Sequence, residues 1–244
     1  MKSNDSTVKN IQVFRWLTFP PLEKHNLVLH GFTIRNHPAS FEQNISLDHL
    51  IQRITRIHRP VVSLRQVHQD ECVVITSKDK LRREYRGDAV LTDRKDIFIS
   101  IQVADCVPIF MLEEKRKVIG LIHAGWKGTL LGIAKRTIET ARDQLGCEPG
   151  DFTIWFGPSI RSCCYRVSDE VAILFDDEYV RPSAKMSVTL DLIGINRKQL
   201  LGCGVKDNMM FATDSCTCCE EKLFYSYRRE KENIGRMVGF LGLK

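Results

Sequence analysis

The sequence predicts an α/β fold, with mixed, partly antiparallel sheets and flanking helices layered as αββα in a single domain over residues 1–244. Short apolar runs of strand length alternate along the chain with three or four segments of helical periodicity, which favours such a layered fold. No internal repeat, low-complexity tract or obvious linker divides the chain. Because 43% of its residues are hydrophobic, the chain can bury about 70% of its unfolded surface in one core.

The N-terminal third predicts strands and one amphipathic helix. Residues 11–30 indicate a strand, a Pro-Pro break and a second short strand that ends at Gly31. Apolar residues then recur at helical spacing over residues 47–58, and the polar face of this predicted helix carries Arg53 and Arg56. Residues 61–67 and 72–76 follow as β-rich runs.

The stretch from residue 97 to residue 128 is the most informative. After strands at 89–91 and 97–103, VPIFML, EEKRK and VIGLIHA indicate a β-hairpin with a charged turn. If Leu112 pairs with Val118, Cys106 and His123 come within one residue of facing each other at the open end of the hairpin. Thiolate and imidazole are ligands that zinc prefers, so this pair indicates a metal site.

The remaining elements follow in order. A helix is predicted from Gly128 to Leu145 with Gly146 as its C-cap, then a strand at 152–156. An irregular turn leads to a helix at 169–175, and residues 176–187 are expected to form a loop. Asp191 is the predicted N-cap of a helix that extends through Leu201. Three β-like runs, MMFATDSC, LFYSYRR and MVGFLGL, end the chain.

His68 follows the 61–67 strand, so its side chain could be a third ligand at the open end of the hairpin, beside Cys106 and His123. A lone histidine at a strand end is more often a core or surface residue, so both interpretations stay open on spacing alone. Gly125 and Gly128 indicate that something approaches the backbone closely beside His123.

Composition excludes several classes of protein. The N-terminal MKSNDSTVKNIQ has no apolar signal region and no apolar run reaches membrane-spanning length, so we expect a cytoplasmic protein without a membrane partner. The net charge of +6 is spread along the chain and gives no nucleic-acid footprint.

The nine cysteines lie partly in clusters, Cys163 with Cys164 and Cys216 with Cys218 and Cys219. In a reducing compartment such residues are buried thiols or metal ligands. The second cluster has one Cys-X-X-Cys spacing and no second pair to complete a zinc knuckle, so we expect buried thiols there rather than a second metal site.

The chain also resembles a known family through pieces that occur in the same order. These pieces are GFTIR (31–35), RQVH (65–68), GDAVLTD (87–93), ADCVP (104–108), HAGWKG (123–128), FGPSIRSCCYRV (156–167), LDLIGINRKQLLGCGV (190–205) and CTCCEEKLFYSYRRE followed by GRMVGFL. From about residue 28 to its end, the chain is similar to the laccase-domain or "polyphenol oxidase" family of zinc-dependent purine nucleoside phosphorylases.

The resemblance implies one zinc ion per chain, held by His68, Cys106 and His123, with an open fourth position. It implies phosphorolysis of adenosine, inosine, guanosine and methylthioadenosine to a free base and ribose 1-phosphate, with adenosine deamination as a side activity. The partners would then be nucleoside and phosphate, and the protein a monomer or small homo-oligomer.

Five further residues are candidates for the site. Arg35, Arg53 and Lys127, with the helix N-terminus beside His123, are candidate phosphate partners, and Gln66 could bond a sugar hydroxyl. Asp105 could orient a ligand histidine, carry a proton or only stabilise its turn. Residues 36–46 depart from the family's glycine-rich continuation.

Three alternatives stay open. Cys106 and His123 could be the nucleophile and base of a cysteine-dependent hydrolase. A zinc-stabilised binding module would need no reaction. A copper-dependent phenol oxidase fits less well, because multicopper centres need about ten histidines in His-X-His pairs, whereas this chain has seven histidines and no such pair.

Overall fold

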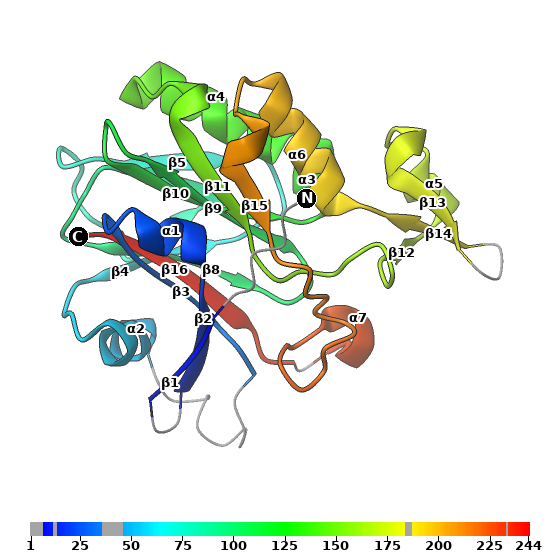
Figure 1. Ribbon diagram of the computed structural model, residues 1–244, viewed down its shortest axis with the longest axis horizontal. Helices are drawn as coiled ribbons and strands as arrows, with labels where there is room; N and C mark the ends of the chain where they lie inside the picture. The colour runs from blue at the N-terminus through cyan, green and yellow to red at the C-terminus, as the bar shows by residue number, and fades with distance from the viewer. Residues whose placement is uncertain (1–6, 12–13, 36–45, 184–186, 233) are drawn as a thin grey trace.

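Two β-sheets stack face to face between outer helices, which confirms the predicted layering (Figure 1). The computed structural model describes residues 7–11, 14–35, 46–183, 187–232 and 234–244. Most of the divergent loop at 36–46 lies outside these residues, and so do parts of the predicted 11–30 and 176–187 segments. Within the described part of the chain, every helix is too short or too polar to cross a bilayer.

The larger sheet has seven strands in the order β1-β2-β3-β16-β8-β4-β6. It is mixed, because β4 runs parallel to both β6 and β8 while the other pairs are antiparallel. Its strands are β1 (Thr7–Ile11), β2 (Phe14–Thr18), β3 (Val28–Thr33), β4 (Val61–Arg65), β6 (Glu84–Arg86), β8 (Phe98–Val103) and β16 (Met237–Leu243).

The second sheet has six strands in the order β15-β11-β9-β10-β7-β5 and is also mixed. Its strands are β5 (Cys72–Ile75), β7 (Ala89–Thr92), β9 (Val107–Glu113), β10 (Val118–Ala124), β11 (Phe152–Phe156) and β15 (Met210–Ala212). A separate three-stranded sheet consists of β12 (Arg166–Val167), β14 (Ser187–Leu190) and β13 (Val180–Ser183).

The helices cover the outer faces of the two large sheets. In Figure 1, α3, α4 and α6 lie over the six-stranded sheet and α2 lies under the seven-stranded one. The α-helices are α1 (Pro20–Lys24), α2 (Leu47–Thr55), α3 (Trp126–Leu130), α4 (Ile133–Leu145), α5 (Asp169–Ala172), α6 (Leu192–Gly202) and α7 (Tyr227–Glu230). Short 3-10 turns are η2 (Pro149–Asp151), η3 (Asp177–Tyr179) and η4 (Asp207–Met209).

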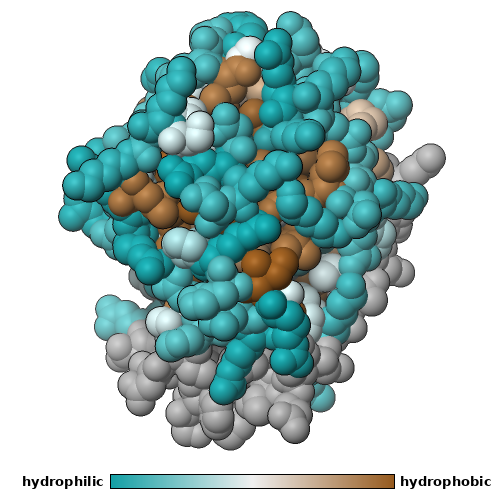
Figure 2. All heavy atoms as spheres, turned by 90° about the vertical axis from the view of Figure 1, so that its left-hand side faces the viewer, coloured by the Kyte–Doolittle hydropathy of each residue, from teal (hydrophilic) through white to brown (hydrophobic). Residues whose placement is uncertain are grey.

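The core fills the spaces between these layers. Strand β9 is buried on both faces, so its sequence reads as a continuous apolar run. Phe110 and Leu112 point into the space between the sheets, while Ile109 and Met111 pack toward α4 and α6. On the face shown in Figure 2, exposed apolar side chains form small patches separated by hydrophilic ones.

Phe110 joins the two sheets. Its ring meets Phe19 edge-on with 4.9 Å between the centroids, and a Cβ added at Gly239 on β16 would lie 3.0 Å from Phe110. Gly239 on the seven-stranded sheet therefore leaves room for the Phe110 ring from the six-stranded sheet. This contact fixes the distance between the sheets.

The structure corrects four local predictions. LFYSYRR, expected to be a β-like run, contains no strand and ends in a helix at Tyr227–Glu230. Val118 pairs with Glu113 and Ile119 with Leu112, so the hairpin turn is one residue shorter than expected. The helix predicted from Gly128 is broken, because Gly132 adopts a left-handed φ of 80° between α3 and α4. The segment expected to be a loop at 176–187 contains η3 and β13.

Other predicted boundaries are confirmed. Gly146 caps α4 with a φ of 65°, and the Asp191 side chain accepts a hydrogen bond from the Gly194 N–H at the start of α6. The helix predicted over residues 47–58 forms as α2, which ends at Thr55 because Arg56 adopts a left-handed φ of 63°.

Phe110→Ala is expected to lower the free energy of unfolding by about 3–5 kcal/mol, because the cavity would lie between two sheets that cannot collapse onto it. Urea unfolding followed by tryptophan fluorescence measures this. Ile173→Ala is the control, since Ile173 is 79% exposed and its removal should change stability by no more than about 0.5 kcal/mol. Similar losses for the two variants would contradict this view of the core.

Candidate active site

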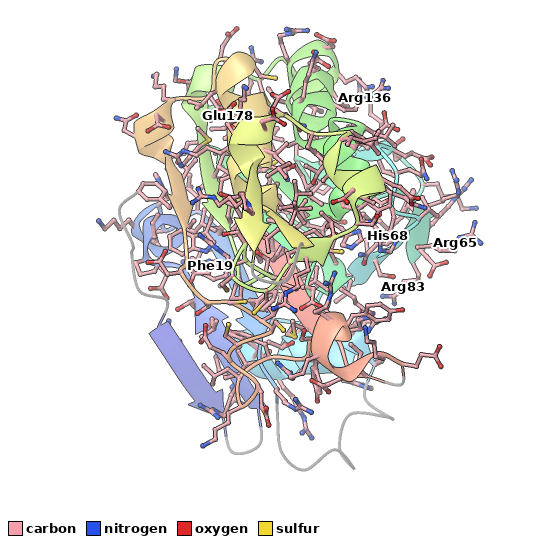
Figure 3. All side chains as sticks on the ribbon, turned by 90° about the vertical axis from the view of Figure 1, so that its right-hand side faces the viewer. Phe19, Arg65, His68, Arg83, Arg136 and Glu178 are labelled. Carbon is pink, nitrogen blue, oxygen red and sulfur yellow. The ribbon has the colours of Figure 1, made fainter. Side chains whose placement is uncertain are left out.

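His68, Cys106 and His123 meet where several strand ends converge. His68 follows β4, Cys106 lies between β8 and β9, and His123 is near the end of β10. One ligand atom from each residue lies within 4.8 Å of the others. Figure 3 shows His68 above α7 and further into the molecule than Arg65, which extends outward at the edge of the view. The structure therefore brings together the three residues that the sequence singled out for a metal.

Asp88, at the start of β7, connects the two histidines. One carboxylate oxygen lies 2.8 Å from His123 Nδ1 and accepts a hydrogen bond from the His68 backbone N–H at 3.0 Å. The other accepts from the backbone N–H groups of Val67 and Gln69. Because Nδ1 of His123 faces a carboxylate, Nε2 is the nitrogen left for a metal.

This buried group of charges shifts the pKa values of its members. Burial alone would raise the pKa of the Cys106 thiol, but the charge of His123 and hydrogen bonds from both histidines lower it to about 6. Burial would lower the pKa of His123, whereas Cys106 and Asp88 raise it to about 9. Without a metal, a thiolate and an imidazolium thus face each other near neutral pH.

The glycines beside His123 allow this close approach. A Cβ at Gly125 would lie 3.0 Å from Cys106 Sγ and 3.3 Å from His68 Cδ2, inside the space that a bound ion and its ligands need. A Cβ at Gly128 would lie 3.0 Å from the Gln69 carbonyl oxygen. The close backbone approach expected from HAGWKG is confirmed.

The three ligands open into a pocket of about 650 Å³, a size typical of small-molecule sites. Its wall combines apolar and aromatic side chains with two arginines. The lining includes Leu64, Gln66, Gln102, Ala104, Asp105, Trp126, Ile160, Tyr165, Leu192, Tyr227, Arg228 and Arg236. Burial raises the pKa of Tyr165, so its phenol stays protonated and can donate a hydrogen bond.

Asp105 does not take the expected place beside a histidine. Its carboxylate accepts hydrogen bonds from the Thr217 and Ser226 hydroxyls at 2.6 and 3.1 Å and from the Arg228 backbone N–H at 2.7 Å. It thereby anchors the C-terminal segment to the turn that carries Cys106. Asp88 has the orienting contact that the sequence analysis considered for Asp105.

Among the described residues, the pocket wall does not include the three predicted phosphate partners. Arg35 binds both carboxylate oxygens of Glu230, at 2.9 and 3.0 Å, and lies over the Tyr225 ring. Arg53 is on α2, in the outer helical layer. Lys127 is exposed, with Nζ 5.5 Å from the centroid of the Trp126 ring.

Gln66 does line the pocket, but its amide already pairs with the backbone of Gln102. It donates to the Gln102 carbonyl and accepts from the Gln102 N–H, both at 2.8 Å. One amide hydrogen and one lone pair are left for a ligand.

Asp88 and Arg236 have places at the site that sequence reasoning did not assign, and Arg228 also lines the pocket. Arg228 stacks on Tyr165, with Cζ 5.3 Å from the ring centroid, and donates to the Arg166 carbonyl at 2.6 Å. For Asp88 a signal was present, because it is a carboxylate next to Gly87 at the start of a wholly apolar strand. A buried charge in that position needs partners nearby.

Fold and site together define a protein in which three residues that could hold a metal ion, His68, Cys106 and His123, face a pocket of small-molecule size. The sequence profile described as "Multi-copper polyphenol oxidoreductase laccase" matches residues 19–244, and the chain belongs to that family.

Several proteins resemble this chain in sequence or structure. It is 33% identical to Purine nucleoside phosphorylase YlmD of Bacillus subtilis (strain 168) over 192 residues, 73% of this chain and 69% of the relative. It is 33% identical to Adenosine deaminase RL5 of an unknown prokaryotic organism, over 72% of each chain. The crystal structure of YlmD from Geobacillus stearothermophilus superposes with a TM-score of 0.84 at 26% identity, covering 98% of this chain and 100% of that one.

Asp88→Asn is expected to weaken Zn²⁺ binding by about 10–100-fold, because an amide NH₂ group would face backbone N–H donors that now meet a carboxylate. Competition with a chromophoric chelator measures the dissociation constant. Asp96→Asn is the matched control, because Asp96 pairs with Arg94 at the surface. Equal zinc affinity in both variants would show that Asp88 does not hold the ligands.

Proposed function

We propose that this chain is a zinc-dependent purine nucleoside phosphorylase that converts adenosine, inosine, guanosine or methylthioadenosine and phosphate to a free base and ribose 1-phosphate. One observation carries the proposal: the His68, Cys106 and His123 cluster opens into a pocket lined by aromatic residues and arginines, in a chain whose relatives bear this name. We propose one such centre in a single domain.

The donor set supports zinc rather than copper. Two imidazoles and one thiolate satisfy three positions of a tetrahedral zinc ion and leave the fourth for water or substrate, as in catalytic sites. A chain with seven histidines and no His-X-His pair lacks the ligands of a multicopper centre. The family's descriptive title therefore does not describe the ligands of this chain.

The pocket residues suit a nucleoside and a phosphate in different places. Trp126, Tyr165 and Tyr227 offer flat surfaces for a purine. Arg228 and Arg236 take the role first considered for Arg35 and Arg53, because guanidinium groups bind phosphate oxygens in pairs. Zinc, when bound, supplies a Lewis acid beside the reacting oxygen.

In the proposed reaction, a phosphate oxygen forms a bond to C1′ of the ribose as the bond from C1′ to the base nitrogen breaks. The bonding pair leaves with the base, which takes up a proton. The backbone of Arg228 is held by Asp105, and its guanidinium is held by the Arg166 carbonyl and the Tyr165 ring, so the guanidinium is positioned before phosphate arrives. Tyr165 is a protonated phenol in the pocket wall and can donate to the departing base.

His123→Ala is expected to lower phosphate-dependent base release by at least about 100-fold, in line with the loss of an essential catalytic group. The assay follows adenine and hypoxanthine release from adenosine and inosine, with and without phosphate, beside zinc content. His49→Ala is the control because His49 is a surface residue of α2 that bonds Ser46. Full base release by the His123→Ala variant would contradict the proposed function.

The same assay covers adenosine deamination, which the named deaminase relative favours as a second activity at this site. Inosine formed from adenosine without phosphate reports it directly. Cytoplasmic location and a monomer or small homo-oligomer stay predictions from the sequence.

A cysteine-dependent hydrolase is the second candidate, favoured by the lowered pKa of Cys106 beside His123. The two candidates differ in their response to metal removal. We expect a strong chelator to abolish base release and added Zn²⁺ to restore it. Alkylating Cys106 in the metal-free protein should then prevent that recovery, and activity that survives complete zinc removal would favour the hydrolase.

A further inference from the structure

Four cysteine sulfurs gather outside the pocket, on two loops far apart in sequence. Cys163 and Cys164 lie between β11 and β12, and Cys216 and Cys219 lie between β15 and α7, on the segment coloured orange in Figure 1. All four Sγ atoms are within 4.8 Å of one another. Cys163 and Cys219 are exposed, so the prediction of buried thiols at Cys216, Cys218 and Cys219 is wrong for Cys219.

The separations fit a single tetrahedral ion. With zinc–sulfur bonds of about 2.3 Å, the sulfurs of a tetrahedron lie about 3.8 Å apart. The Sγ atoms of Cys163 and Cys164 are 3.8 Å apart, those of Cys163 and Cys219 are 3.7 Å apart, and those of Cys164 and Cys219 are 3.3 Å apart. Only small shifts are needed to place one ion among them, and the group is too tight for a cluster of several metal ions.

The loop that carries Cys216 is fixed by hydrogen bonds. The Cys216 backbone N–H donates to the Glu220 carboxylate at 2.9 Å. The turn also pairs with the first loop, because Ser159 and Cys216 form an isolated parallel bridge and the Thr217 N–H donates to the Ser159 carbonyl at 3.1 Å.

Cationic side chains hold the same turn. Arg229 donates to the carbonyls of Thr217 and Cys218, both at 2.9 Å. Arg161 donates to the Thr213 carbonyl, also at 2.9 Å. Positive charge next to the cluster would offset part of the negative charge of four thiolates on a divalent ion.

We propose that Cys163, Cys164, Cys216 and Cys219 bind a second zinc ion, separate from the centre at His68, Cys106 and His123. Four thiolates leave no open position, so this site is structural. Zinc is assigned because it is a redox-inactive ion that favours an S₄ tetrahedron and binds by displacing the thiol protons. The ion would join the loop that carries the pocket residues Ile160 and Tyr165 to the loop that precedes α7.

A disulfide explains the cluster less well. Adjacent residues have Cα atoms about 3.8 Å apart across a trans peptide, whereas disulfides need at least about 4.4 Å, so Cys163 does not pair with Cys164. A bond between Cys164 and Cys219 would leave Cys163 and Cys216 without a function, and all nine cysteines are free in the structure. A single zinc ion engages all four.

The test counts metal in protein purified with reductant and reconstituted with Zn²⁺, and does not depend on enzyme activity. Wild type should hold two zinc ions per chain. The Cys216→Ser, Cys219→Ser double variant should lose one, the His68→Ala, His123→Ala double variant should lose the other, and the combined variant should lose both. Cys203→Ser is the matched control and should keep two, because Cys203 belongs to neither group.

Cobalt substitution gives an independent signature. In the His68→Ala, His123→Ala background, bound Co²⁺ should show the intense sulfur-to-metal charge-transfer absorption of several thiolates, and Cys163→Ser should reduce it. This single change at an exposed residue keeps the test informative if the double cysteine variant fails to fold. Unchanged absorption in Cys163→Ser would remove that residue from the proposed ligand set and overturn the four-cysteine site.

Three results would overturn the proposal: zinc content that the Cys216→Ser, Cys219→Ser double variant retains in full, iron in place of zinc at the cysteines, or a mass lower by two hydrogens that shows a disulfide under reducing conditions. If base release fails but two zinc ions are bound, the proposed activity is wrong and this site stands. If zinc is bound only at His68, Cys106 and His123 and base release succeeds, the four-cysteine site is wrong and the proposed activity stands.

Discussion

The buried carboxylate of Asp88 is the group on which the arrangement of His68, Cys106 and His123 depends. With no exposed surface, it is stabilised by the ring of His123 and by three consecutive backbone N–H groups of the turn at His68. Those bonds hold His68 in a left-handed conformation with a φ of 58°, which a non-glycine residue adopts at a cost that local contacts must offset. One side chain thus sets both the tautomer of one ligand and the backbone of another.

The stacked sheets make this contact possible. His68 leaves a strand of the seven-stranded sheet, whereas Asp88 and His123 belong to neighbouring strands, β7 and β10, of the six-stranded sheet. The site therefore spans two layers whose separation depends on packing such as that of Phe110 against Gly239. Asp88 therefore ties the backbone of His68, which follows a strand of the seven-stranded sheet, to His123 on the six-stranded sheet.

The sequence predicted the metal cluster better than the groups around it, and the reason is physical. A hairpin brings Cys106 near His123 even though the true register is one residue away from the predicted one, because ligand side chains tolerate such a shift. Spacing alone left two interpretations of His68, a metal ligand or a core or surface residue, because no local pattern links it to the hairpin. The family resemblance favoured the ligand.

From the sequence, Arg35 and Arg53 were plausible phosphate partners. The role of a cation depends, however, on which carboxylate or carbonyl lies next to it in the fold, and Arg35 pairs with Glu230. That pairing joins residues 195 positions apart and leaves no periodic signal.

The wall of the pocket depends on long-range bonds rather than on the sheets. Asp105 is the neighbour of ligand Cys106, and its carboxylate holds Thr217, Ser226 and the backbone of Arg228. Thr217 lies within the Cys216-X-X-Cys219 turn, so Cys106, the thiol cluster and the pocket residue Arg228 are linked through one buried carboxylate. An ion at the four cysteines would fix the far side of this turn while Asp105 fixes the near side.

Because α7 is only four residues long and carries both Tyr227 and Arg228, it cannot hold these side chains in place by its own helical stability. The two anchors on the preceding turn supply the rigidity that a positioned guanidinium requires.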